Sequence, residues 1–140
     1  MQQEVVLSVE GKQCYPGQDP DTIELVTTGT LEYTDLGWKL CYEESELTGL
    51  AGVHTTFLVR DGEVTLIRTG RLSSEMIFRE GESHDSLYKM EFGALMLTVC
   101  ANRVQVNLTQ QGGVIYLCYT IEVEQSAAGT IEYHLDIRAK

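Results

Sequence analysis

The chain has 140 residues, 43% of them hydrophobic and 22% charged, which predicts one globular domain spanning residues 1–140 and excludes a disordered chain. Its net charge of -11 at pH 7 would repel nucleic-acid backbones and anionic membranes, so neither is expected as a partner. The N-terminus lacks the features of a secretory signal, and no apolar run approaches the roughly 20 residues of a membrane-spanning helix.

Alternation of apolar and polar residues continues along almost the whole chain, and helical periodicity is almost absent. In chain order, the alternating segments are residues 4–10, 22–33, 38–42, 54–60, 63–70, 73–80, 86–93, 94–100, 103–108, 115–123 and 131–137. Turn residues separate them at 35–37, 60–63, 80–82 and 111–113, and loops are expected at 16–20 and 126–129. The pair Asp61-Gly62 predicts a two-residue hairpin, since this pair suits a type I′ turn.

This pattern predicts an all-β fold of about eight to ten short strands in an antiparallel meander with one buried face. Closing such a sheet removes its exposed edges, so we expect an up-and-down barrel, with a two-sheet sandwich as the alternative. The aromatic residues at apolar-face positions are expected to pack in the core; they are Trp38, Tyr42, Tyr88, Phe92 and Tyr119.

Two charged residues fall on apolar faces. In the segment CYEESELTGL, residues 41–50, Glu44 continues the apolar face of Trp38 and Tyr42. In the segment EVTLIRTG, residues 63–70, Arg68 shares the apolar face of Leu66. A buried charge needs a partner, so the simplest interpretation is that Glu44 and Arg68 pair inside the barrel. Glu44 could instead lie solvated at a rim, beyond a bulge, because acids are dense between residues 43 and 46.

A functional interpretation makes Arg68 the anchor for the acidic head of a small, partly apolar ligand. The other residues expected to line that site are Glu44, Tyr42, Thr56, Met76 and Tyr88. The structural alternative is an ion pair that plugs an interior already filled by side chains, since a barrel of about eight strands is just wide enough to be filled.

Catalytic and metal-binding motifs are sparse, and no cofactor is predicted. The three histidines stand far apart without ligand spacing, and no phosphate loop or nucleophile elbow occurs. The four cysteines form no CxxC pair and three lie in apolar segments, which favours free thiols in a cytoplasmic protein over a disulfide framework.

Several segments in order resemble the DUF1934 family: DTIELVTTGTL, YEESELTGLAG, TTFLVRDGEVTLIRTG, SSEMIF, HDSLYKMEFGALML and the hairpin at Gly112-Gly113. The resemblance covers nearly the whole chain. It implies a calycin-like, lipocalin-like β-barrel of bacteria of the Firmicutes type, where the chain would be cytoplasmic. It implies no biochemical activity.

Two functions from different classes therefore stay open. The first is a non-enzymatic barrel that binds a small ligand at Arg68. The second is a filled barrel that acts through its surface or edges on a partner protein or on a second copy, as a homodimer. An enzyme ranks third. The volume of the interior discriminates between the first two, because a filled barrel has no room for a ligand.

Overall fold

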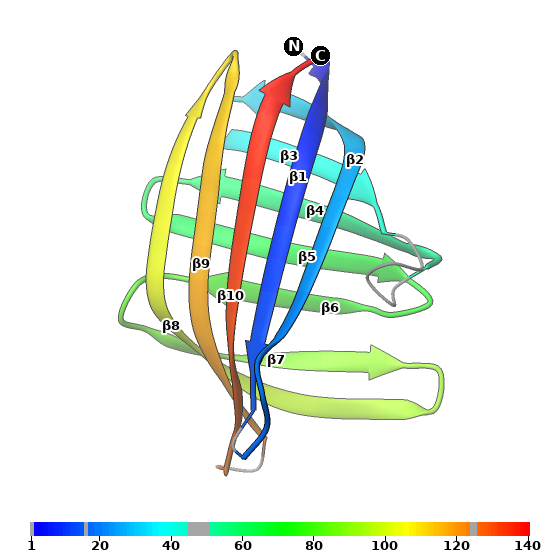
Figure 1. The fold of residues 1–140 in the computed structure, drawn as a ribbon, viewed down its shortest axis with the longest axis vertical. Helices are drawn as coiled ribbons and strands as arrows, with labels where there is room; N and C mark the ends of the chain where they lie inside the picture. Colours follow the sequence, from blue (N-terminus) through cyan, green and yellow to red (C-terminus); the bar gives the residue numbers. More distant parts are fainter. Residues whose placement is uncertain (1, 16, 45–50, 124–125) are drawn as a thin grey trace.

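The computed structural model describes residues 2–15, 17–44, 51–123 and 126–140. These residues form ten β-strands, as predicted for an all-β chain (Figure 1): β1 (Gln2–Cys14), β2 (Asp21–Thr34), β3 (Gly37–Glu43), β4 (Val53–Arg60), β5 (Glu63–Gly70), β6 (Ser74–Phe78), β7 (Ser83–Met90), β8 (Gly93–Thr109), β9 (Gly112–Val123) and β10 (Ser126–Ala139). Within these ranges no helix has the length and apolar character needed to cross a membrane.

All ten strands belong to one antiparallel sheet in the order β6-β5-β4-β3-β2-β1-β10-β9-β8-β7. Strands that follow each other in the chain lie next to each other in the sheet, except β6 and β7, which form its two edges. The first strand, β1, pairs with the last, β10, so both termini lie together (Figure 1). The two edges meet at one bridge, in which Ser73 and Lys89 exchange backbone hydrogen bonds of 2.9 and 2.8 Å. The predicted up-and-down barrel is confirmed as a nearly closed barrel with a seam between β6 and β7.

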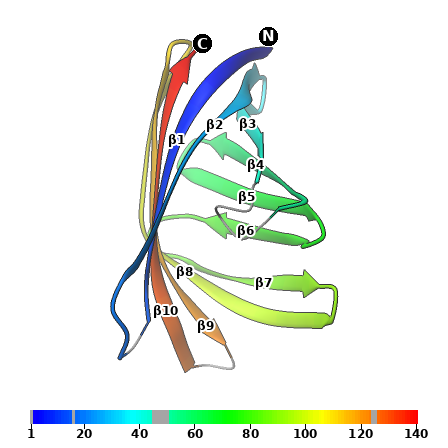
Figure 2. The same ribbon diagram turned by 45° about the vertical axis from the view of Figure 1, so that its right-hand side comes forward.

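The long strands form one curved wall, and the shorter strands β3 to β6 project from it and cross it at a steep angle (Figure 2). The β4–β5 hairpin turns at Asp61-Gly62 as predicted, with Gly62 at a φ of 70°. Gly29 lets β3 lie close against β2, because a Cβ there would stand 2.4 Å from the Cys41 carbonyl oxygen.

Three expectations about element boundaries are wrong. The segments 94–100 and 103–108 form one strand, β8, because a bulge between Ala101 and Arg103 absorbs the break in alternation. Residues 126–129 belong to β10 rather than to a loop, with another irregularity between Ala127 and Gly129. Phe92 lies in the turn between β7 and β8 and is 98% exposed, so it is not a core residue.

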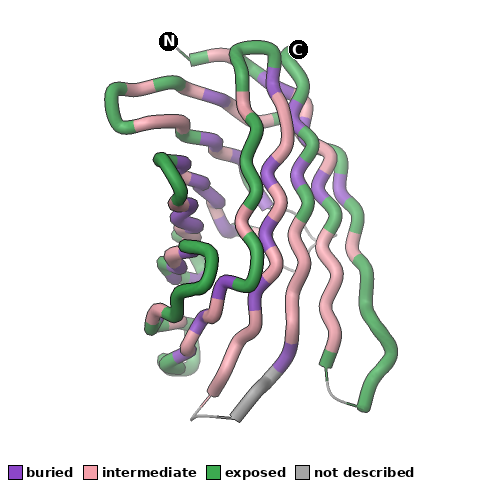
Figure 3. Tube along the Cα trace, turned by 90° about the vertical axis from the view of Figure 1, so that its left-hand side faces the viewer, coloured by how far each residue is buried: buried purple, intermediate pink, exposed green. Residues whose placement is uncertain are grey.

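The inward faces of the strands pack into one hydrophobic core, and buried positions alternate with less buried ones along several of the strands (Figure 3). Its largest fully buried side chains include Phe57, Phe78, Leu40 and Leu66, which fill the middle of the barrel. The open spaces therefore lie toward the ends and at the seam, where the candidate sites are found.

Candidate functional site

A cavity of about 350 Å³ lies at the end of the barrel where Arg68 projects inward. Its lining residues come from β1 and from β5 to β10, with one from the loop after β1; they are Gln13, Tyr15, Arg68, Met76, Tyr88, Leu95, Leu97, Tyr119, Ile121, Gly129, Ile131 and Tyr133. This lining is mainly apolar and aromatic, with one cation and four phenol hydroxyls, which is the composition typical of a small-molecule pocket.

Arg68 and Glu44 meet inside the barrel, as the sequence predicts. Arg68 Nε lies 4.0 Å from Glu44 Oε2, the Arg68 side chain is 11% exposed, and that of Glu44 is fully buried. The Thr55 hydroxyl donates a hydrogen bond to the same carboxylate oxygen, and the Glu44 amide donates to the Val53 carbonyl. Glu44 is therefore buried and partnered, so the alternative of a solvated rim carboxylate is wrong.

Tyrosine hydroxyls surround this pair. Tyr42 and Tyr133 share a hydrogen bond of 3.1 Å, and Tyr42 stacks on Phe57 behind the cavity. Burial, followed by the proximity of Tyr133 and Glu44, raises the pKa of Tyr42 above its ordinary value of 10.0. Burial likewise raises the pKa of Tyr119 and of Tyr133, against the lowering effect of Arg68. These phenols stay protonated at neutral pH and can donate hydrogen bonds.

The electrostatics of Arg68 reflect the same neighbours. Burial on its own lowers the pKa of the guanidinium, but Tyr133, Tyr119 and Glu44 raise it by more, so the net pKa lies above its ordinary value. Arg68 Nε has no hydrogen-bond partner among the described residues, and its contact with Glu44 is an ion pair at the limit of direct contact. The guanidinium is therefore charged and incompletely hydrogen-bonded.

The structure brings together three of the six residues predicted for the site: Arg68, Met76 and Tyr88 all line the cavity. Tyr42 and Glu44 lie behind it and contact the others through Tyr133 and Arg68. The placement of Thr56 is wrong, because it pairs across the sheet with Cys41 and its hydroxyl lies 3.6 Å from Cys41 Sγ, on the opposite face from Tyr42. Thr55 occupies the inward position instead.

Sequence analysis missed Tyr15, Tyr119 and Tyr133 as lining residues. Tyr119 and Tyr133 sit in strands with the alternation of core residues, so no local signal separates a cavity position from a packed one. Tyr15 follows β1 and folds over Gly129, where an added Cβ would come within 2.6 Å of its ring. That close approach depends on a residue far away in the sequence.

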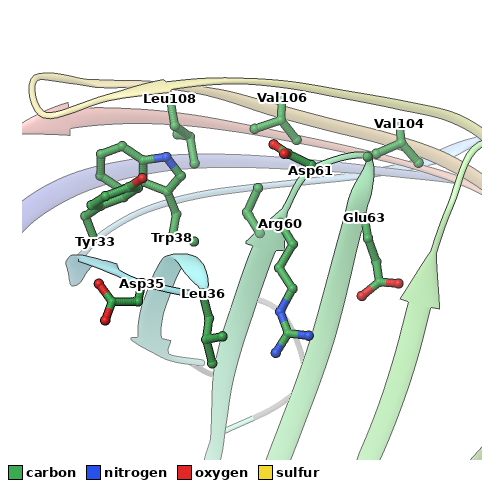
Figure 4. Close-up of a pocket in the computed structure, with 13 residues that line it drawn as sticks. Tyr33, Asp35, Leu36, Trp38, Arg60, Asp61, Glu63, Val104, Val106 and Leu108 are labelled. Carbon is green, nitrogen blue, oxygen red and sulfur yellow. The ribbon is translucent and has the colours of Figure 1, made fainter.

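A second opening lies at the other end of the barrel (Figure 4). This groove of about 560 Å³ is bounded by the turn between β2 and β3, the β4–β5 hairpin and one edge of β8. A third groove, of about 460 Å³, follows the outside of the seam and also reaches Arg68. In the described part of the chain, no group of three or more histidine, cysteine or acidic residues could hold a metal ion.

The comparisons with known proteins fit this architecture. A family model described as "Domain of unknown function (DUF1934)" matches residues 7–137. The chain belongs to the DUF1934 family. A relative, the uncharacterized beta-barrel protein YwiB of Bacillus subtilis (strain 168), is 30% identical over 124 residues, covering 88% of this chain and 86% of YwiB.

The crystal structure of ywiB protein from Bacillus subtilis matches this fold with a TM-score of 0.88 at 25% identity, over 99% of this chain and 93% of that one. The resemblance seen in the sequence is thereby confirmed. The DUF1934 name states no activity, so a function for this barrel has to be argued from the chemistry of its own residues.

Proposed function

We propose that this protein is a non-enzymatic binding protein that holds a small, partly apolar anion in the cavity at Arg68. The observation that carries the proposal is a cavity of about 350 Å³ with a buried arginine in its wall. This volume falls at the lower end of the range of pockets that enclose small ligands.

The donors around the cavity favour an anionic head group. Arg68 has an Nε without a hydrogen-bond partner among the described residues, and its planar fork suits a carboxylate. Tyr88, Tyr119 and Tyr133 line the same space and can donate hydrogen bonds to that head group. Glu44 then orients Arg68 and balances its charge while the cavity is empty.

The apolar part of the ligand would lie against the remaining wall. Met76, Leu95, Leu97, Ile121 and Ile131 supply hydrophobic surface on the strands that surround Arg68. An aliphatic or aromatic body attached to a carboxylate fits both halves of this lining. None of the described lining residues pairs a nucleophile with a general base, which favours binding over catalysis.

Two further expectations belong to this proposal. A small ligand held in the end of the barrel would make this protein similar to lipocalins, whose barrels hold one small ligand. The four described cysteines are all free thiols, which supports a cytoplasmic location.

Native mass spectrometry on protein purified from the cells that make it tests the proposal. We expect a recurrent small anion that leaves on unfolding. Leu95→Trp should exclude it, because Leu95 lines the cavity, is 38% exposed and is not one of the two residues of the ion pair. Met96→Trp is the matched control, since Met96 is the next residue of β8, is 54% exposed and does not line the cavity.

Loss of the ligand in Leu95→Trp and its retention in Met96→Trp would support binding in this cavity. An apo mass for the wild-type protein, or equal retention in both variants, would contradict the proposal. The Arg68–Glu44 pair would then be the structural ion pair that the sequence leaves open.

A further inference from the structure

The outer edge of β8 is unpaired along its second half. β7 covers this edge only as far as Cys100, whereas β8 continues to Thr109 with β9 on its other side. The Val104 amide donates to the Glu80 carboxylate at 3.0 Å, and among the described residues no backbone group of residues 105–109 is bonded on this edge. The backbone groups of successive strand residues point alternately to the two edges of the strand. The N–H and C=O groups of Val106 and Leu108 therefore point to the unpaired edge, as those of Val104 do.

Apolar side chains line the groove beside this edge. Val104, Val106 and Leu108 project from β8 toward the hairpin tips, and Leu108 faces the ring pair of Tyr33 and Trp38 (Figure 4). The centroids of that ring pair are 4.7 Å apart, and Tyr33 is 59% exposed. A strand added to β8 would place every second side chain against this surface.

The charges at the groove favour a basic partner. Asp35 and Asp61 line it and form no ion pair with any described residue, whereas Glu63 is already paired with Arg79 at 3.1 Å. Arg60, the one cation among the described lining residues, points away from β8 (Figure 4). A second copy of this chain would bring another net charge of -11 to the contact, which disfavours self-pairing.

We propose that the free edge of β8 from Gln105 to Thr109, with the groove beside it, is a docking site for an extended, basic segment of a partner protein. The segment adds as a strand to β8, and its backbone pairs with the outward groups of Val106 and Leu108. Its alternate apolar residues enter the groove, and its lysine or arginine residues lie near Asp35 and Asp61. This site is independent of the cavity at Arg68.

A capped heptapeptide with the sequence Lys-Val-Thr-Val-Thr-Val-Lys tests the proposal. Trp38 is the single tryptophan of the chain and lines the groove, so its fluorescence reports binding directly. We expect saturable binding that weakens with salt. A peptide with glutamate at both ends should bind more weakly, and one with N-methylated backbone amides should not bind, because it cannot pair as a strand.

The variant Val106→Pro distinguishes binding through backbone hydrogen bonds to β8 from binding through side-chain contacts alone. Proline removes the outward amide and leaves the ladder to β9 intact, so the fold should survive. We expect the affinity for the peptide to fall roughly fivefold or more, as for a lost hydrogen bond, while Val106→Thr keeps the amide and most of the affinity. Asp61→Asn, which keeps the turn chemistry, should reduce the dependence on salt.

Equal affinity in wild type and Val106→Pro, or equal binding of the acidic peptide, would overturn the proposal. Sedimentation of the wild-type protein as a dimer that Val106→Pro dissociates would also overturn it, because the edge would then be an interface between copies.

Discussion

Arg68 is held inside the barrel by a carboxylate at the limit of ion-pair distance, with tyrosine hydroxyls around both groups. Removing only the cation leaves the Glu44 charge in a buried site. We expect Arg68→Met to lower the free energy of unfolding by about 3–5 kcal/mol in urea titrations, because a stranded buried charge is costly. The double variant Glu44→Gln, Arg68→Met should recover part of that loss, whereas additive losses would argue against contact between the two groups.

Neighbouring threonines give a sharper test of which face points inward. Thr55 donates to Glu44 in the interior, and Thr56 lies against Cys41 on the other face. Thr55→Val should cost about 1–3 kcal/mol because the carboxylate loses a donor, and Thr56→Val should cost less than about 1 kcal/mol because a thiol is a weak partner. Equal losses in the two variants, measured by urea unfolding, would show that the orientation is wrong.

These two threonines also mark where residue-level prediction fails. Alternation from Phe57 and Val59 places Thr55 on the inner face, and Glu44 and Arg68 were found by the same parity argument. Assigning Thr56 to the site broke that parity. By contrast, no local pattern distinguishes Tyr133 and Tyr119 at a cavity wall from fully packed residues, because the distinction depends on distant strands.

The elements of the sheet differ in how firmly they are tied to their neighbours. β1 pairs with β10 along a continuous register from Val5 to Cys14, whereas β6 and β7 share one bridge and a 2.6 Å hydrogen bond from the Ser86 hydroxyl to the Glu75 carbonyl. Short, weakly bonded contacts open at lower free energy than long ladders. The seam should therefore be the first part of the barrel to open.

Amide hydrogen exchange tests this with Lys89→Pro. The Lys89 amide donates to the Ser73 carbonyl across the seam and to no other described residue, so proline removes one seam bond and keeps the β7–β8 ladder. We expect exchange at Ser73 to speed up about fivefold, as for the loss of about 1 kcal/mol, with amides of β1 and β10 unchanged. Lys89→Thr is the control. Uniform acceleration across the sheet would mean that the seam does not open by itself.

Element order was predictable because each strand carries its own alternation and each tight turn its own residues, as at Asp61-Gly62. The bulge between Ala101 and Arg103 was not predictable from the sequence, because a residue of β8 is extra only relative to the strand it pairs with, β9. Phe92 was misplaced for a related reason: the strand pattern continues through it, but the chain turns back at that point.

At the scale of the whole molecule, the sequence predicts a closed sheet but not where it closes. The seam between two consecutive strands follows from β1 pairing with β10, which only long-range packing decides. The same closure divides the interior into a packed middle and two open ends, one with Arg68 and one beside β8. Internal volume is therefore a property of the assembled barrel rather than of any segment.

The buried tyrosines couple the stability of the barrel to alkaline pH. Burial raises the pKa of Tyr42, Tyr119 and Tyr133 above 10.0, the ordinary value that these groups regain on unfolding. Above pH 10 the unfolded chain releases protons that the folded chain keeps, so stability is fully present below that pH and falls as pH rises toward the folded pKa values. Each such tyrosine should contribute a slope of about 1.4 kcal/mol per pH unit.

Urea unfolding between pH 9 and pH 11 measures that slope. Tyr119→Phe removes one buried phenol and should make the decline in stability shallower, because one fewer proton separates the folded and unfolded states. Tyr33→Phe removes an exposed phenol and should leave the slope unchanged. An equal slope in all three proteins would mean that the Tyr119 phenol ionises as readily in the folded barrel as in water. The hydrogen bond that Tyr119 is proposed to donate to the ligand would then be lost as that phenol ionises near its ordinary pKa of 10.0.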